Sequence, residues 1–82
     1  MSYKVYILKS ELKPRFYIGH TNNLENRLNC HNTGKVRSTK SYKPWKIIYT
    51  EEFENKKEAY KREMQIKSYK KGEAFKKLLT KD

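Results

Sequence analysis

The 82-residue chain carries 20 Lys and Arg against nine Asp and Glu, which gives a formal charge of +11. Its length predicts a single domain over residues 1–82. No apolar run reaches the roughly 18 residues of a membrane span, the first residues lack the pattern of a signal peptide, and the single Cys30 excludes an internal disulfide and a cysteine-rich zinc site. We therefore expect a cytoplasmic protein without a membrane association. Its charge favours a polyanionic partner, most simply nucleic acid.

The first part of the chain predicts a hairpin. Residues 3–8 are apolar and β-prone, which predicts a strand. Residues 9–14 are polar and end in proline, which is typical of a loop. Residues 15–19 predict a second strand that pairs with the first.

A helix is predicted next. Asn22 with Glu25 three residues later forms a helix start signal, and we expect Asn22 to be the N-cap. Leu24 and Leu28 follow helical spacing. Gly34 is a typical C-terminal stop.

Residues 35–44 predict a basic loop and residues 45–53 a third strand. Asn55, with Glu58 three residues on, predicts the start of a second helix that runs to about residue 71, and a last helix follows at residues 73–79. The predicted order is β-β-α-β-α-α. The expected fold is a small α/β domain with a three-stranded antiparallel sheet flanked by helices.

The second helix places charge where apolar side chains belong. Its apolar residues define one arc at about 100° per residue: Ala59, Tyr60, Met64 and Ile66. Glu63 and Lys67 fall within this arc, and burying unpaired charges costs several kcal/mol. One interpretation is an i, i+4 ion pair between them at the edge of the arc. The other is that Glu63 faces a cleft and holds a divalent metal through its carboxylate oxygens.

Two further pairs have structural and functional interpretations. Arg27 and His31 lie four residues apart, and they predict either a solvated arginine beside a partly buried histidine or a phosphate clamp. Alternation along the hairpin places Tyr6 and Tyr17 on one face, as sheet-packing side chains or as part of a site. Gly19 follows, where the missing side chain would let a ligand or backbone approach.

Together these residues resemble the GIY-YIG nuclease family. Tyr17-Ile18-Gly19 reproduces the second half of the motif, and Lys4-Val5-Tyr6 stands where the first half has Gly-Ile-Tyr. Arg27 with His31 is similar to the first helix of the family, and Glu63 to its metal-binding helix. The similarity is greatest to small standalone bacterial members, related to the N-terminal nuclease domain of the excision-repair incision subunit.

The resemblance implies a catalytic role for each of these side chains. Tyr6 would act as general base on the attacking water, with Tyr17 hydrogen-bonded nearby and cationic neighbours, His20 among them, lowering its pKa. Arg27 would stabilise charge on the phosphoryl oxygens, and His31 would assist in proton transfer or phosphate binding. Glu63 would hold one Mg²⁺ or Mn²⁺. We expect the catalytic side chains to line one concave surface, with Glu63 on the same side of the sheet as Tyr6.

The positive charge predicts a surface that binds a phosphate backbone without reading bases. Five residues are predicted to contact nucleic acid: Lys35, Arg37, Lys40, Lys43 and Lys67. The structural alternative is a solvated basic surface that keeps the protein soluble. We expect weak, salt-dependent binding with little sequence preference, to DNA more than to RNA.

Three hypotheses for the function follow. The first is a metal-dependent endonuclease, which the relation to a repair subunit connects with DNA metabolism. The second is a non-catalytic module that binds nucleic acid and keeps the nuclease fold. The third is an interaction domain for an acidic protein.

Overall fold

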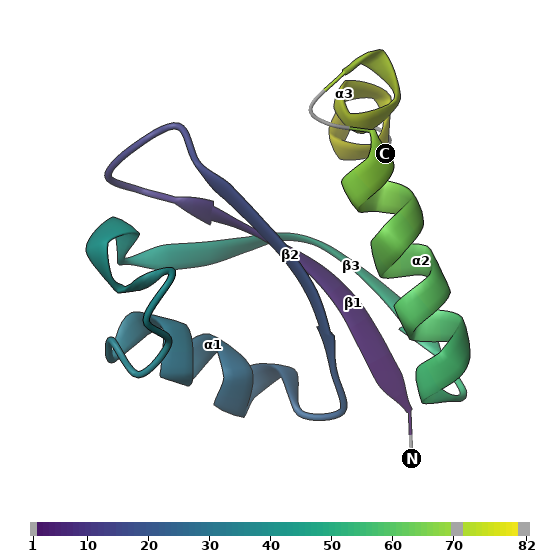
Figure 1. Cartoon of the computed structure of the whole chain (residues 1–82), viewed down its shortest axis with the longest axis horizontal. Helices are drawn as coiled ribbons and strands as arrows, with labels where there is room; N and C mark the ends of the chain where they lie inside the picture. The colour runs from purple at the N-terminus through teal and green to yellow at the C-terminus, as the bar shows by residue number, and fades with distance from the viewer. Residues whose placement is uncertain (1, 70–71, 81–82) are drawn as a thin grey trace.

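The computed structural model describes residues 2–69 and 72–80. The elements in these ranges are β1 (Tyr3–Ser10), β2 (Phe16–Thr21), α1 (Leu24–Asn32), a 3₁₀ turn η1 (Lys40–Tyr42), β3 (Trp45–Phe53), α2 (Lys56–Ser68) and α3 (Glu73–Thr80) (Figure 1). The order and the α/β class confirm the prediction. No helix in the described ranges is long and apolar enough to cross a membrane.

The sheet is antiparallel, with strand order β2-β1-β3. The central strand β1 is covered on both faces, and its residues from Val5 to Leu8 are at most 1% exposed. Tyr6 pairs with Gly19 and Leu8 with Tyr17, so Tyr6 and Tyr17 lie on the same face of the hairpin. Because β2 is an edge strand, its edge away from β1 is accessible to a ligand.

The helices divide between the two faces of the sheet, as Figure 1 shows: α1 lies on one side, α2 and α3 on the other. Each face has its own core. The core under α2 and α3 is built from Val5, Ile7, Ala59, Ile66 and Phe75. The core under α1 is built from Tyr6, Leu8 and Trp45, with Tyr17, Leu24, Leu28 and Tyr42 packed around them.

The helix starts were predicted to within one residue. Asn55 caps α2 as predicted, and its side chain accepts from the Glu58 amide. The predicted cap of α1, Asn22, is wrong: Asn23 accepts from the Asn26 amide at 3.0 Å. Two adjacent asparagines offer the same capping chemistry, and the end of β2 at Thr21 decides which one reaches the helix.

The helix α2 ends earlier and is rotated differently from the prediction. It ends at Ser68, and the expected last turn at residues 70–71 lies outside the described residues. Tyr60 and Met64, predicted in the inward arc, are 51% and 39% exposed, whereas Glu63 is buried. Only a narrow stripe of α2 meets the small sheet face, so the buried charge is more central than the periodicity suggested.

Candidate active site

A cleft of about 340 Å³ opens at the edge strand β2. It is lined by Tyr6, Tyr17, Gly19, His20, Thr21, Arg27 and Glu63. Four of the five side chains predicted as catalytic therefore meet there, and His31 does not. A larger hollow, about 570 Å³, runs along the asparagine-rich side of α1. Neither Tyr6 nor Tyr17 lines this hollow.

Gly19 is what lets Tyr6 reach this cleft. A Cβ atom at position 19 would lie 2.7 Å from the hydroxyl oxygen of Tyr6 and 2.9 Å from its Cζ. Both distances are shorter than any contact a real Cβ makes, and the ring of Tyr6 is buried and cannot move aside cheaply. The glycine of the second motif therefore makes room for the tyrosine of the first.

Arg27 brings positive charge to the two tyrosines. Its guanidinium interacts with the hydroxyl groups of Tyr6 and Tyr17, and the interaction with Tyr6 raises the pKa of Arg27. Burial nevertheless raises the pKa of Tyr6 to about 12, and Arg27 offsets only part of this. Arg27 thus lowers the pKa of Tyr6 as expected of a cationic neighbour, but burial outweighs it and the net shift is upward.

His31 lies behind Tyr6, inside the core under α1. It is fully buried, with Nε2 3.4 Å from the Tyr6 hydroxyl and Nδ1 2.8 Å from Oγ1 of Thr39. The Thr39 hydroxyl also lies 3.3 Å from the carbonyl of Val36, and each ring nitrogen of His31 has one hydrogen-bond partner. Burial, with Arg27 nearby, lowers the pKa of His31 to about 4, so the ring is neutral at pH 7. His31 does not line the cleft, because α1 turns the ring into the core, and its role in proton transfer or phosphate binding stays a prediction.

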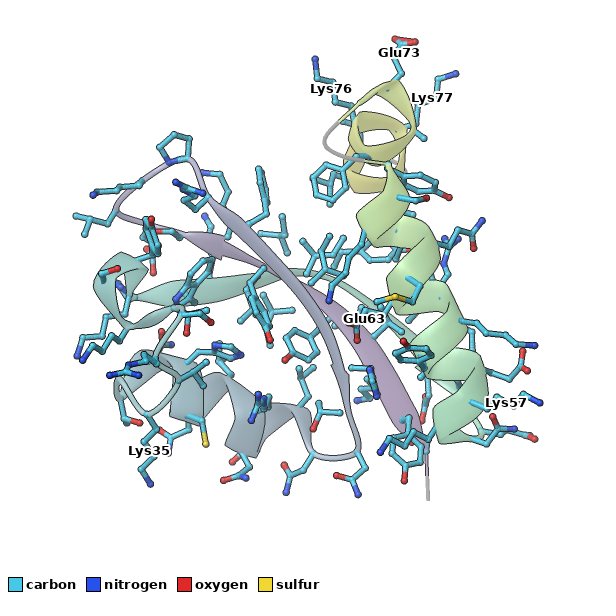
Figure 2. The ribbon with its side chains drawn as sticks, viewed as in Figure 1. Lys35, Lys57, Glu63, Glu73, Lys76 and Lys77 are labelled. Carbon is cyan, nitrogen blue, oxygen red and sulfur yellow. The ribbon has the colours of Figure 1, made fainter. Side chains whose placement is uncertain are left out.

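Glu63 is 7% exposed, and both of its oxygens are engaged. Oε1 accepts from Nδ1 of His20 at 2.5 Å, and Oε2 pairs with Nζ of Lys67, also at 2.5 Å. Figure 2 shows Glu63 on the side of α2 that faces the sheet. The predicted ion pair with Lys67 is present, and the same carboxylate lines the cleft. The two interpretations of this residue are thus compatible.

Tyr6 and Glu63 reach the cleft from opposite faces of the sheet. Tyr6 packs in the core under α1, while Glu63 extends from α2 on the other face. The expectation that both lie on one side of the sheet is therefore wrong. They meet because β2 is the edge strand and Gly19 leaves its middle without a side chain. Their charges interact there, since Glu63 contributes to the raised pKa of Tyr6.

His20 belongs to the cleft and was expected only as a cationic neighbour of Tyr6. It pairs with Val5 across the hairpin, which turns its ring toward α2, where it meets Glu63. Its place directly after Gly19 is the signal in the sequence, because the next residue of a strand points to the opposite face.

A second group of side chains fixes the rotation of α2. Arg62 contacts both oxygens of Glu51 on β3, with nitrogen–oxygen distances of 2.8 to 3.1 Å, and Tyr49 also donates to Glu51. The bond to Glu51 raises the pKa of Arg62. Because Glu63 follows Arg62 on the helix, this bidentate pair holds the neighbouring carboxylate toward the cleft. No local pattern indicates this pair, since the partner lies eleven residues away.

A divalent ion at this cleft would depend on one carboxylate. Within residues 2–69 and 72–80, no group of three or more His, Cys, Asp or Glu side chains is placed to hold a metal. A single carboxylate is nevertheless compatible with Mg²⁺. This ion is usually bound by one or two carboxylates, and waters and substrate phosphates supply its other ligands. Such an ion would take oxygens that His20 and Lys67 now contact.

The basic loop between α1 and β3 lies on the α1 side. Asn32 bonds to the backbone of Trp45 in both directions, at 2.6 and 3.0 Å, and the Trp45 ring donates to the carbonyl of Thr39. The loop is thereby held against the core that contains Tyr6. Its predicted contact residues are exposed: Lys35, Arg37, Lys40 and Lys43. Figure 2 shows Lys35 extending away from the ribbon.

Comparison with known proteins gives a consistent result. The GIY-YIG catalytic domain family matches residues 2–77. A UPF0213 protein of Clostridium perfringens is 48% identical over 64 residues, which cover 77% of this chain and 68% of that protein. A UPF0213 protein of Oceanobacillus iheyensis is 41% identical over 73 residues, 88% of this chain and 84% of that protein. The solution NMR structure of the UPF0213 protein from Bacillus halodurans is similar, with a TM-score of 0.51 and 30% identity over 83% of this chain and 72% of that one.

Proposed function

Because the chain belongs to the GIY-YIG catalytic domain family, we propose that it hydrolyses phosphodiester bonds in nucleic acid, with DNA as the preferred substrate. The observation that carries this proposal is the cleft itself. It collects Tyr6, Arg27 and Glu63 from three different elements at an open sheet edge. These polar groups are distant in sequence and meet at one cleft.

Arg27 is the group that receives the phosphate. Its guanidinium lies at the cleft and presents several donors in a plane, which suits two phosphoryl oxygens. It would hold the scissile phosphate beside Tyr6 and Tyr17 and stabilise the charge that grows during attack.

Tyr6 and His31 together orient the attacking water. With the proton of His31 on Nδ1, Nε2 would accept from the Tyr6 hydroxyl, whose oxygen lies 3.4 Å away. Of the two lone pairs of the Tyr6 oxygen, one would face Arg27 and the other would accept from a water in the cleft. With a pKa of about 12, Tyr6 stays protonated in the protein alone. One divalent ion held by Glu63 would supply the positive charge that favours removal of this proton and stabilises the leaving oxygen.

The exposed basic side chains of the loop, together with Lys67, would follow the phosphate backbone. Lysine ammonium groups position a strand without reading its sequence. We expect low sequence specificity and an affinity that falls steeply with salt.

One observation favours a second function, a binding module without turnover. His20 and Lys67 already occupy both oxygens of Glu63, and the pKa of Tyr6 is raised rather than lowered. Such a protein would bind nucleic acid through Arg27 and the lysines and leave the phosphodiester intact.

A cleavage assay decides between these functions. Branched, single-stranded and duplex DNA, and RNA, are incubated with the protein and Mg²⁺ or Mn²⁺. We expect cleavage that stops with EDTA and falls at least about 100-fold in Tyr6→Phe and in Glu63→Gln. Glu58→Gln, an exposed acid on the same helix, is the matched control and keeps full activity.

Two results would contradict the hydrolytic function. Activity that survives both Tyr6→Phe and Glu63→Gln would come from a contaminating nuclease. Binding of every substrate without cleavage by the wild-type protein would identify the binding module instead.

A further inference from the structure

Two apolar side chains of α2 lie outside the core, next to the cleft. Tyr60 is 51% and Met64 39% exposed, although the helical pattern places both toward the sheet. They are four residues apart and so form one stripe on the helix. Among the described residues, neither side chain belongs to the core on either face of the sheet.

The stripe adjoins the candidate active site. The ring of Tyr60 meets the ring of His20 edge to face, with centroids 6.0 Å apart. His20 in turn lines the cleft and bonds to Glu63. Tyr60 therefore stands at the rim of the cleft, one helical turn before the carboxylate.

We propose that Tyr60, supported by Met64, is a stacking platform for an unpaired nucleobase beside the phosphate in the cleft. The inference rests on the proposed function and adds the kind of nucleic acid that the cleft accepts. An exposed aromatic ring stacks any base through its π face, and Met adapts to irregular flat surfaces. Lys67, seven residues after Tyr60 and 45% exposed at its side chain, provides the charge for the adjoining backbone.

The platform selects substrates by strand structure and not by sequence. A base in a single strand, flap or junction is free to lie on the Tyr60 ring. A base inside a duplex must first leave its stack and its partner, at a cost of a few kcal/mol. The protein therefore favours nucleic acid with an unpaired base at the position of the cleft.

Binding without metal tests the platform separately from cleavage. The probe is a fluorescein-labelled single strand of about 12 nucleotides, compared with its duplex by anisotropy in EDTA at low salt. We expect Tyr60→Leu to weaken single-strand binding roughly 5- to 50-fold and to change duplex binding less than about twofold. Tyr60→Phe keeps the ring and should keep the affinity. Leu12→Ala truncates a 62% exposed side chain in the β1–β2 loop and should change neither single-strand nor duplex binding.

An abasic scan locates the stacked base. Removing one base of the strand weakens binding by the wild-type protein, and Tyr60→Leu causes no further loss on that abasic strand. Equal affinities of wild type and Tyr60→Leu for the intact strand would overturn the platform, as would equal losses on strand and duplex. Cleavage that persists in that case would leave the proposed function intact. Stacking by a protein that never cleaves would contradict the proposed function alone.

Discussion

The two faces of the sheet bury different kinds of side chain, although one strand supplies both. Under α2 and α3, β1 contributes Val5 and Ile7 to a core of aliphatic and phenyl groups. Under α1, the alternate residue Tyr6 packs beside His31 and Thr39, which are buried and hydrogen-bonded to each other. A single strand therefore serves an aliphatic and phenyl core on one side and, on the other, an aromatic-rich core that also holds hydrogen-bonded polar groups.

The two faces of the sheet therefore contribute to the protein in different ways. The apolar face supplies stability by removing surface from water. The polar face contributes specific bonds, each of which must be satisfied. The candidate active site lies where the two meet, at the edge strand β2, and takes Tyr6 from one face and Glu63 from the other.

The largest effect on stability is expected on the apolar face. Ile66 is fully buried, and Ile66→Ala leaves a cavity that should lower the free energy of unfolding by about 2–5 kcal/mol. The matched control is Met64→Ala on the same helix, which should cost much less because Met64 is partly exposed. Urea unfolding measures both variants. Equal losses would mean that α2 packs through another face.

The polar face should make stability depend on pH. The pKa of His31 is about 4 in the folded protein and about 6.5 in the unfolded chain. Between these values the unfolded state binds the additional proton, so stability falls as the pH falls, by up to about 1.4 kcal/mol per pH unit. The loss starts near pH 6.5 and ends near pH 4.

A variant without a titratable side chain at position 31 isolates the contribution of His31. His31→Gln should be less stable than the wild type at pH 7, and the difference should shrink steadily toward pH 4. A constant difference over this range would contradict the buried neutral histidine.

The boundary between the faces should tolerate little change at Gly19. In Gly19→Ala the new methyl group meets the Tyr6 hydroxyl, and we expect a loss of about 1–3 kcal/mol in stability together with reduced cleavage. Adding Tyr6→Phe should restore part of the stability, because it removes the atom that lies closest. Unchanged unfolding and cleavage of Gly19→Ala would show that the two groups do not touch.

Much of the fold was predictable because its signals are local. Alternation along β1 and β2, the cap at Asn55 and the stop at Gly34 depend on residues near one another in sequence. The structure shows Asn55 capping α2 and Gly34 with a positive φ of 82° after α1. The one-residue error at the start of α1 has the same origin, since adjacent asparagines are locally equivalent.

The site was predictable only in part, because its geometry depends on contacts between distant residues. Glu63 stood out as a charge on an apolar arc, and the structure buries it. The depth of His31 depends on the loop that brings Thr39 over it, and the pairing of His20 with Glu63 spans 43 residues. Periodicity within one helix contains no information on such pairings.

In the proposed function, Tyr6 and Glu63 act on one phosphate from opposite faces of the sheet. A double-mutant cycle of Tyr6→Phe and Glu63→Gln on the cleavage rate tests it most directly. If the two act as one centre, the double variant should be no more than a few-fold slower than the slower single variant. Losses that multiply in the double variant would show that the two faces act independently and would contradict the account.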